Sequence, residues 1–136
     1  MAMRVVNTEL LQIRQAEDVV QVRQAVRKMA VQLGFNLVDQ TKIVTASSEL
    51  ARNTLDYGGG GTAAIELIEN DRRGGVRVIF EDQGPGIRDV DVALRDGYTT
   101  GGGLGLGLGG AKRLSHEFEI SSKLGSGTRV SILRWK

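Results

Sequence analysis

Two polar side chains stand four residues apart in a segment whose apolar spacing predicts a helix that begins after Asp39. Glu49 and Asn53 are separated by about 40° around such a helix and by one turn along it, so they share a face. Because Leu50 is expected toward the core, the pair falls at the edge of the apolar stripe. A carboxylate there can be half desolvated and still reach a cleft, although the spacing also fits a solvated polar pair.

An acidic residue followed by glycines marks a second place where chemistry could occur. Asp82 follows the apolar segment 76–81 and is itself followed by Gly84, Pro85 and Gly86. An aspartate at a strand end places an acceptor at the mouth of a sheet, and the missing side chains let a planar ligand lie against the backbone. A nucleobase fits this description. The alternative is an Asp–Gly turn without a ligand.

Glycine is concentrated in one part of the chain, with ten of the 19 glycines at positions 84–110. In the tract GGGLGLGLGG (101–110), alternate glycines ahead of a helix would expose backbone N–H groups to a polyphosphate near the helix N-terminus. The tract is not a Rossmann fingerprint, since no strand precedes it and position 130 is Val. It is not a P-loop either, because Ala111 follows Gly110. A flexible hinge is the remaining alternative.

Several smaller features accompany these three segments. The sequence GSGT (125–128) predicts a hairpin turn, and Thr99 and Thr100 lie in a suspected lid, where they could touch phosphate or turn the chain. Lys112 and Arg113 could meet a terminal phosphate, although basic residues on a helix are usually solvated. His116 is expected to be exposed on the same helix, and no role is assigned to it.

The elements that must position these residues follow from periodicity and turn signals. We expect helices over 17–33, from just after Asp39, its expected N-cap, to the glycines at 58–61, and from within 103–110 to Phe118. Strands are expected over 9–15, 62–69, 76–81, 119–122 and 128–134, the last four as two hairpins. The sum is an α+β fold in a single domain, 1–136.

Composition excludes several classes of function. The chain has no cysteine and one histidine, so disulfide, zinc and thiol chemistry are not expected. With 18 Lys and Arg against 16 Asp and Glu, and one Trp, two Tyr and three Phe, we expect no nucleic-acid partner. No segment approaches the ~18 apolar residues of a membrane span, so we expect a cytoplasmic protein without a membrane partner.

In order along the chain, SELARN, DQGPG, GGGLGLGLGG and GSGT resemble the N, G1, G2 and G3 boxes of the GHKL ATPase superfamily, which includes gyrase, Hsp90, histidine kinases and MutL. Within it, the phrases TASSELARNTLDY, EDQGPGI and DGYTTGGGLGLGLGGAKRLSHEFEI are similar to the RsbT family of stressosome switch kinases, over nearly the whole chain beyond residue 14. The resemblance implies a Bergerat fold: a mixed, mostly antiparallel sheet with three helices on one face, and ATP under a lid at about 87–107.

The resemblance also implies roles by position. Glu49 takes the place of the general base, Asn53 would ligate Mg²⁺, and Asp82 would accept a hydrogen bond from the adenine amino group. Gly84 and Gly86 would shape the base pocket. The implied nucleotide-binding set is Asn53, Asp82, Gly84, Gly86, Thr99, Thr100, Gly103, Leu104, Gly105, Leu106, Gly107 and Thr128. Phosphoryl transfer needs positioning and charge neutralisation more than covalent help, so a carboxylate and a metal-binding amide are sufficient parts.

The implied function is an ATP-dependent protein serine/threonine kinase that acts as a partner switch. Its kin phosphorylate STAS-domain antagonist and scaffold proteins, and the freed kinase activates a PPM-type phosphatase. The alternative is a nucleotide-gated anti-sigma factor, a sigma-binding module with little turnover. Related anti-sigma factors carry a basic residue in the lid, whereas the tract 99–111 has none. This favours the kinase and leaves the cation at the γ-phosphate unassigned.

Overall fold

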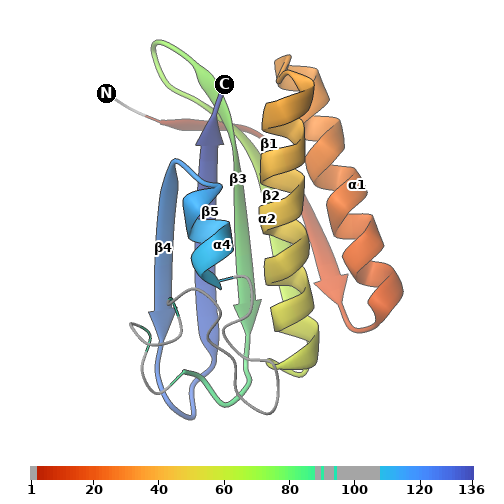
Figure 1. Cartoon of the computed structure of the whole chain (residues 1–136), viewed down its shortest axis with the longest axis vertical. Coiled ribbons are helices and arrows are strands. Elements are labelled where there is room, and N and C mark those ends of the chain that lie inside the picture. Colours follow the sequence, from red (N-terminus) through yellow and green to blue (C-terminus); the bar gives the residue numbers. More distant parts are fainter. Residues whose placement is uncertain (1–2, 88–89, 91–93, 95–107) are drawn as a thin grey trace.

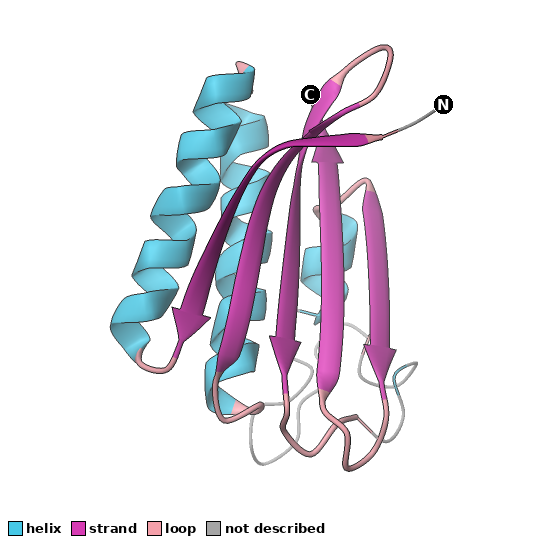
Figure 2. Cartoon of the chain, turned by 180° about the vertical axis from the view of Figure 1, so that it is seen from behind, coloured by secondary structure: helices cyan, strands magenta, loops and turns pink. Residues whose placement is uncertain are grey.

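A computed structural model describes residues 3–87, 90, 94 and 108–136. They form one five-stranded sheet in the order β1-β2-β3-β5-β4. Helices α1 (Ala16–Leu33), α2 (Leu37–Asp56) and α4 (Leu108–Arg113) cover one face of this sheet (Figure 1), and the other face is seen in Figure 2. The strands are β1 (Arg4–Ile13), β2 (Gly61–Glu69), β3 (Gly74–Asp82), β4 (Glu117–Ser122) and β5 (Thr128–Trp135). The expected α+β fold with three helices on one face is therefore confirmed.

The direction of the strands differs in one respect from the expected mixed sheet. Every described strand pair is antiparallel. The connections explain this, because β2–β3 and β4–β5 are hairpins and the two long helices between β1 and β2 bring the chain back to the same end of the sheet. Antiparallel neighbours can be joined in these ways without a crossover.

Helix α1 (Ala16–Leu33) follows the predicted period closely. Gln15 is its N-cap, and the Asp18 carboxylate accepts hydrogen bonds from the backbone N–H groups of Arg14 and Gln15. The helix ends at Gly34, whose positive φ of 82° suits the left-handed C-cap. Its buried face packs into the core with the side chains Val19, Val22, Ala25, Val26, Met29 and Ala30.

Helix α2 (Leu37–Asp56) begins earlier than the sequence predicts. Asp39 was expected as the N-cap, but the side chain of Asn36 caps the helix by accepting a hydrogen bond from the Asp39 N–H at 2.8 Å. Asp39 lies in the first turn and forms an ion pair with Arg134, 2.8 Å away. Leu50 is buried as predicted, together with Ile43, Ser47 and Thr54 on the same face of the helix.

Helix α4 (Leu108–Arg113) is short, and it does not reach Phe118 as expected. Phe118 lies on β4, where it packs against the main cluster of buried residues. His116 is exposed as predicted, but it lies between α4 and β4 rather than on a helix. Its ring Nδ1 accepts a hydrogen bond from the backbone N–H of Trp135 at 2.8 Å.

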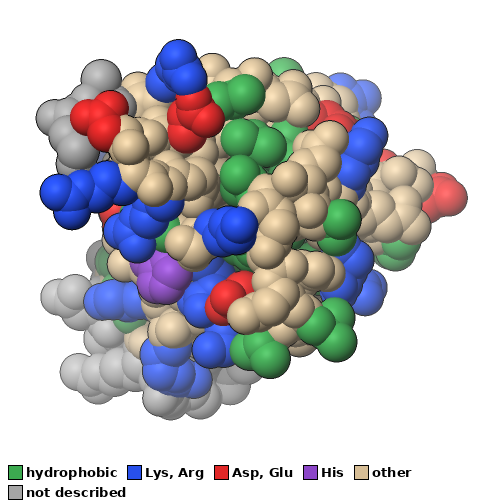
Figure 3. Space-filling model, turned by 90° about the horizontal axis from the view of Figure 1, so that it is seen from above, with side chains coloured by type: hydrophobic (Ala, Val, Ile, Leu, Met, Phe, Trp, Pro, Cys, Tyr) green, Lys and Arg blue, Asp and Glu red, His purple; other side chains and the backbone are tan. Residues whose placement is uncertain are grey.

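Hydrogen bonds of the Arg134 side chain connect the N-terminal end of α2 to β5 and to the end of α4. Arg134 is 9% exposed and donates hydrogen bonds to Asp39 and to the Leu114 carbonyl. The hydrogen bond from Arg134 to the Asp39 carboxylate, together with the positive charge of Arg134, lowers the pKa of Asp39. Partial burial, followed by the charges of Arg134 and Arg73, lowers the pKa of His116. Figure 3 shows basic side chains grouped at this end.

One main cluster of buried residues fills the space between the sheet and the helices, and Ile68, Leu133 and Trp135 form a smaller second cluster. No helix in the described part of the chain is long and apolar enough to cross a membrane. The assignment of residues 1–136 to a single domain stays a prediction. Of the expected lid at 87–107, only residues 87, 90 and 94 are described, so the lid lies almost wholly outside the described residues.

Candidate functional site

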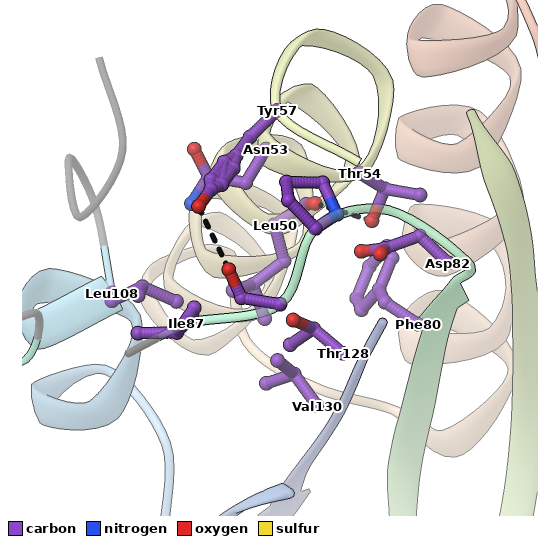
Figure 4. A pocket seen from close by; sticks show the side chains of 12 residues that line it. Leu50, Asn53, Thr54, Tyr57, Phe80, Asp82, Ile87, Leu108, Thr128 and Val130 are labelled. Atoms are coloured by element: carbon purple, nitrogen blue, oxygen red, sulfur yellow. Dashed lines mark hydrogen bonds between the residues drawn. The ribbon is translucent and has the colours of Figure 1, made fainter. Parts of the chain in front are cut away.

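A cavity lies at the end of the sheet where β3 ends and β5 begins. Asp82, the last residue of β3, pairs in register with Thr128, the first residue of β5. The cavity is partly open, and the space of about 420 Å³ between its walls includes open solvent. Its walls come from α2, β3, the loop after β3, α4 and β5 (Figure 4): Leu50, Asn53, Thr54, Tyr57, Phe80, Asp82, Pro85, Gly86, Ile87, Leu108, Thr128 and Val130.

The carboxylate of Asp82 is the acidic group in this otherwise largely apolar lining. Burial raises its pKa above the ordinary value, and hydrogen bonds from the backbone N–H groups of Gly84 and Thr128 oppose that rise. The Gly84 N–H lies 2.9 Å from Oδ1. A partly desolvated acceptor held in place by the backbone is suited to pair with a donor on a planar ligand.

The face of α2 that meets the cavity carries Asn53, which is half-buried. The structure therefore brings Asn53, Asp82, Gly86 and Thr128 to one cavity, as the sequence predicted. Glu49 is exposed and is not part of the lining. It lies one turn, about 6 Å, before Asn53 on the same helix.

The loop 82–87 is pressed between the C-terminal end of α2 and the turn between β4 and β5. A Cβ on Gly84 would lie 2.7 Å from the Gly58 Cα, and a Cβ on Gly58 would lie 2.4 Å from the Asp82 Cγ. Such distances are shorter than real contacts, so only glycine allows the two segments to approach this closely. On the other side, the Gly125 N–H donates to the Pro85 carbonyl at 2.7 Å.

Sequence reasoning missed three contributors to this site. Gly58 allows the close approach of α2 to Asp82, and the run of four glycines at 58–61 was the signal that could have revealed it. Tyr57 was given no role by the sequence, but its hydroxyl donates to the Gly86 carbonyl at 2.8 Å. Ser122 accepts a hydrogen bond from the Ile87 N–H at 2.8 Å, and no sequence motif pointed to it.

The predicted phosphate-binding residues cannot be placed, because they lie outside the described residues. These are Thr99, Thr100, Gly103, Leu104, Gly105, Leu106 and Gly107. The first described residue after this gap, Leu108, lines the cavity. Lys112 and Arg113 are exposed on α4.

A divalent cation at this site would find few protein ligands. No group of three or more His, Cys, Asp or Glu side chains that could hold a metal occurs in the described ranges. The amide oxygen of Asn53 is an oxygen ligand in the cavity wall, and Mg²⁺ is commonly held by one or two protein oxygens together with the phosphates of a substrate. The described residues of the cavity wall therefore fit a Mg²⁺ ion that is bound together with a nucleotide.

Comparison with known proteins identifies the family. Residues 38–136 match the family described as "Histidine kinase-, DNA gyrase B-, and HSP90-like ATPase". The chain is 48% identical over 118 residues to "Serine/threonine-protein kinase RsbT" of Bacillus subtilis, a match that covers 87% of this chain and 89% of that protein. It is 30% identical over 112 residues to "Anti-sigma F factor" of Clostridium kluyveri, covering 79% of each.

Solved structures share the fold at lower identity. The RsbU and RsbW domains of Rv1364c from Mycobacterium tuberculosis match with a TM-score of 0.67 and 21% identity, over 96% of this chain but 33% of that one. The SiaB–SiaC complex from Pseudomonas aeruginosa matches with a TM-score of 0.60 and 14% identity, over 98% and 91%. Together, the matched segment and the extent of the identity show that this chain belongs to the histidine kinase-, DNA gyrase B- and HSP90-like ATPases, and within them to the RsbT-type serine/threonine-protein kinases.

Proposed function

We propose that this kinase transfers the γ-phosphoryl group of ATP to a serine or threonine of a STAS-domain antagonist or scaffold protein. When released from that partner, it activates a PPM-type phosphatase. The observation that carries the proposal is the convergence of Asn53, Asp82 and Thr128 on one cavity, with Glu49 exposed one turn before Asn53 on the same helix. A buried binding end and an exposed carboxylate suit a kinase whose acceptor arrives from solvent.

In this proposal the base of ATP lies at the β3 end of the cavity. Asp82 accepts from the exocyclic amino group of adenine. The Gly84 N–H holds the Asp82 carboxylate in place, and the Gly86 backbone forms part of the wall beside the ring. The raised pKa of Asp82 is consistent with this role, because a donor on the ligand would replace water that burial has removed. Thr128, paired with Asp82 in the sheet, completes this side of the pocket.

The phosphates would then extend from the cavity along α2. Asn53 would hold Mg²⁺ through its amide oxygen, and the metal, when bound, would neutralise phosphate charge. Glu49 would take the proton of the attacking serine or threonine hydroxyl as its oxygen bonds to the γ-phosphorus and ADP leaves. The N–H groups of Gly103, Gly105 and Gly107, with Leu104, Leu106, Thr99 and Thr100 beside them, would contact the phosphates, as the sequence predicts.

The partners are inferred from the relatives. One is called a serine/threonine-protein kinase, and another an anti-sigma factor. Two structures with the same fold contain RsbU and RsbW domains or a complex with SiaC, which favours a regulator that exchanges protein partners. The similarity to the anti-sigma factor supports a second candidate, a nucleotide-gated sigma-binding protein with little turnover. Both candidates would use the same pocket.

Transfer of labelled γ-phosphate from Mg-ATP to purified STAS-domain proteins of the same organism tests the proposal. The wild-type chain is compared with Glu49→Gln, which keeps the shape of the side chain and removes the carboxylate. We expect label on a partner serine or threonine and a roughly 10²- to 10⁴-fold loss of rate in the variant, as for loss of a general base. ATP affinity should not change.

Two other results would change the assignment. Binding of ATP without transfer to any STAS-domain protein would favour the sigma-binding alternative, which capture of a purified sigma factor in the presence of ATP would then test. Wild-type transfer rates in Glu49→Gln would show that Glu49 is not the base.

A further inference from the structure

The peptide group between Gly86 and Ile87 is bonded at both of its polar atoms to side chains. Its carbonyl oxygen accepts from the Tyr57 hydroxyl at 2.8 Å, and its N–H donates to the Ser122 Oγ at 2.8 Å. The described peptide bonds are all trans, so the carbonyl and the N–H point in opposite directions. Tyr57 at the end of α2 and Ser122 at the end of β4 therefore hold this peptide group from opposite sides.

Ser122 extends the connection to β5. Its Oγ lies 2.8 Å from the Thr128 Oγ1 and donates to the Gly127 carbonyl at 3.1 Å. Thr128 lines the cavity and pairs with Asp82, whose side chain accepts from the Thr128 backbone N–H. A continuous path of hydrogen bonds thus joins α2 to Thr128 through a single peptide group.

Local backbone geometry fixes the orientation of this peptide group. Gly86 has φ of +78°, which L side chains rarely adopt, and a Cβ there would lie 2.3 Å from the Lys123 carbonyl oxygen. On the other side, Tyr57 is the C-cap of α2, and its backbone N–H donates to the carbonyl of Asn53 at 3.0 Å. The hydroxyl that bonds to the loop therefore belongs to the last turn of α2, the turn that starts at Asn53.

We propose that Tyr57 and Ser122 act as one pair of positioning residues for the nucleotide pocket, joined through the Gly86–Ile87 peptide group. The pair fixes the loop after Asp82 relative to Asn53 on one side and to Thr128 on the other. Because each bond helps to orient the same rigid peptide group, loss of either one releases both sides, and chains of hydrogen bonds strengthen one another. The role rests on the proposed function, since it concerns the pocket that the proposal assigns to ATP.

A double-mutant cycle tests whether the two residues act together. Tyr57→Phe removes only the hydroxyl, and Ser122→Ala removes only the Oγ. Ser121→Ala is the matched control, since Ser121 is the neighbouring serine on the same strand and is exposed. The measurements are calorimetric affinities for Mg-ATP and Mg-GTP and the KM and kcat of phosphotransfer. Circular dichroism confirms that each variant is folded.

We expect each single variant to weaken ATP binding about 2- to 10-fold, the contribution of one hydrogen bond. The double variant should lose no more than about the same factor, rather than the product of the two. The effect should appear in KM with little change in kcat, and the preference for ATP over GTP should fall. Ser122→Thr, which restores the hydroxyl, should recover affinity, and Ser121→Ala should match the wild type.

Effects that multiply in the double variant, or ATP affinities that stay at the wild-type value in both single variants, would overturn the pairing. So would equal losses for ATP and GTP, which indicate a general loosening of the fold. Failure of the proposed function gives a different result, because the wild-type chain itself would then show no ATP binding or no transfer.

Discussion

Helix α2 is attached to the molecule in two different ways at its two ends. At its N-terminus, Asp39 forms an ion pair with the nearly buried Arg134, which also donates to the Leu114 carbonyl. At its C-terminus, glycine backbone replaces side chains, and Gly58 lies against Gly84 and Asp82 beside a cavity. At the first end, the charged groups of Asp39 and Arg134 bond to each other. At the second end, Asp82 and Asn53 lie in the wall of the cavity.

The pKa directions show the same contrast. Pairing lowers the pKa of Asp39, which means that the folded protein favours its charged form. Burial raises the pKa of Asp82, which means that the folded protein tolerates its charge at a cost. A costly polar group at a cavity is typical of functional sites. We therefore expect changes at the first end to reduce stability and changes at the second to reduce function.

The largest effect on function is expected from Gly84→Ala. The new Cβ would need the space of the Gly58 backbone, so the loop after Asp82 must shift, and a displacement of about 1 Å can cost roughly 10²-fold in activity. Phosphotransfer kinetics and ATP titration measure this loss. Ser121→Ala on β4 is the control, since Ser121 is exposed and is not part of the cavity lining. Equal behaviour of the two variants would contradict the close packing at the pocket.

Arg134→Met should reveal the opposite behaviour at the other end of α2. It keeps much of the aliphatic side chain and removes the bonds to Asp39 and the Leu114 carbonyl. We expect a loss of about 1 to 3 kcal/mol in the free energy of unfolding, measured by urea titration, as for removal of a partner from buried polar groups. ATP affinity should change less than about twofold. A large loss of ATP affinity in Arg134→Met, with an unchanged free energy of unfolding, would contradict the view that this end of α2 serves stability.

Asp82→Asn should separate stability from binding within the pocket. The pKa of the Asp82 carboxyl is raised in the folded protein. The contribution of such a group to stability is present at low pH and is lost as pH rises through the folded pKa, so at pH 7 the charged carboxylate lowers the stability of the fold. The neutral variant should therefore have a melting temperature at pH 7, without nucleotide, equal to or above that of the wild type. Scanning calorimetry checks this, and a clear drop would show that the carboxylate stabilises the fold.

The smallest effect is expected from titration of His116. Its folded pKa lies below the ordinary value near 6.5, because of burial and the charges of Arg134 and Arg73, with Lys42 adding to them and Asp39 opposing them. Its stabilising contribution is complete above about pH 6.5 and is lost as pH falls through the folded pKa. Urea midpoints between pH 7.5 and 5 should fall less steeply in His116→Gln. The same pH dependence of the urea midpoint in both proteins would show that His116 does not contribute to it.

Much of this fold could be predicted from the sequence, because helix α1 and the two hairpins carry strong periodicity and turn signals. Strand β1 begins at Arg4, whereas the sequence predicts a start at residue 9. The prediction missed residues 4–8 because they are all exposed and therefore give no alternating pattern. The N-cap of α2 was misplaced because Asn36 and Asp39 are both good capping residues. In the structure Asn36 caps the helix, and the Asp39 carboxylate pairs instead with Arg134, 95 positions away. Long-range partners of this kind leave no local signal.

The site was predictable where it depends on motifs and not where it depends on single hydrogen bonds. Asn53, Asp82 and Thr128 meet at one cavity because strand register and helix packing bring their segments together. Tyr57 and Ser122 could not be foreseen, since a hydroxyl that bonds to one peptide group follows no sequence pattern. The roles of Glu49 and of the glycine-rich tract stay predictions.

Titration of the wild-type chain and of Asp82→Asn with Mg-ATP and Mg-GTP tests the central claim most directly, namely that the cavity beside Asp82 receives the adenine of ATP. We predict that the wild type prefers ATP and that this preference is largely lost in Asp82→Asn, while the variant remains folded. An unchanged preference for ATP in the variant, or equal affinity of the wild type for both nucleotides, would contradict the account.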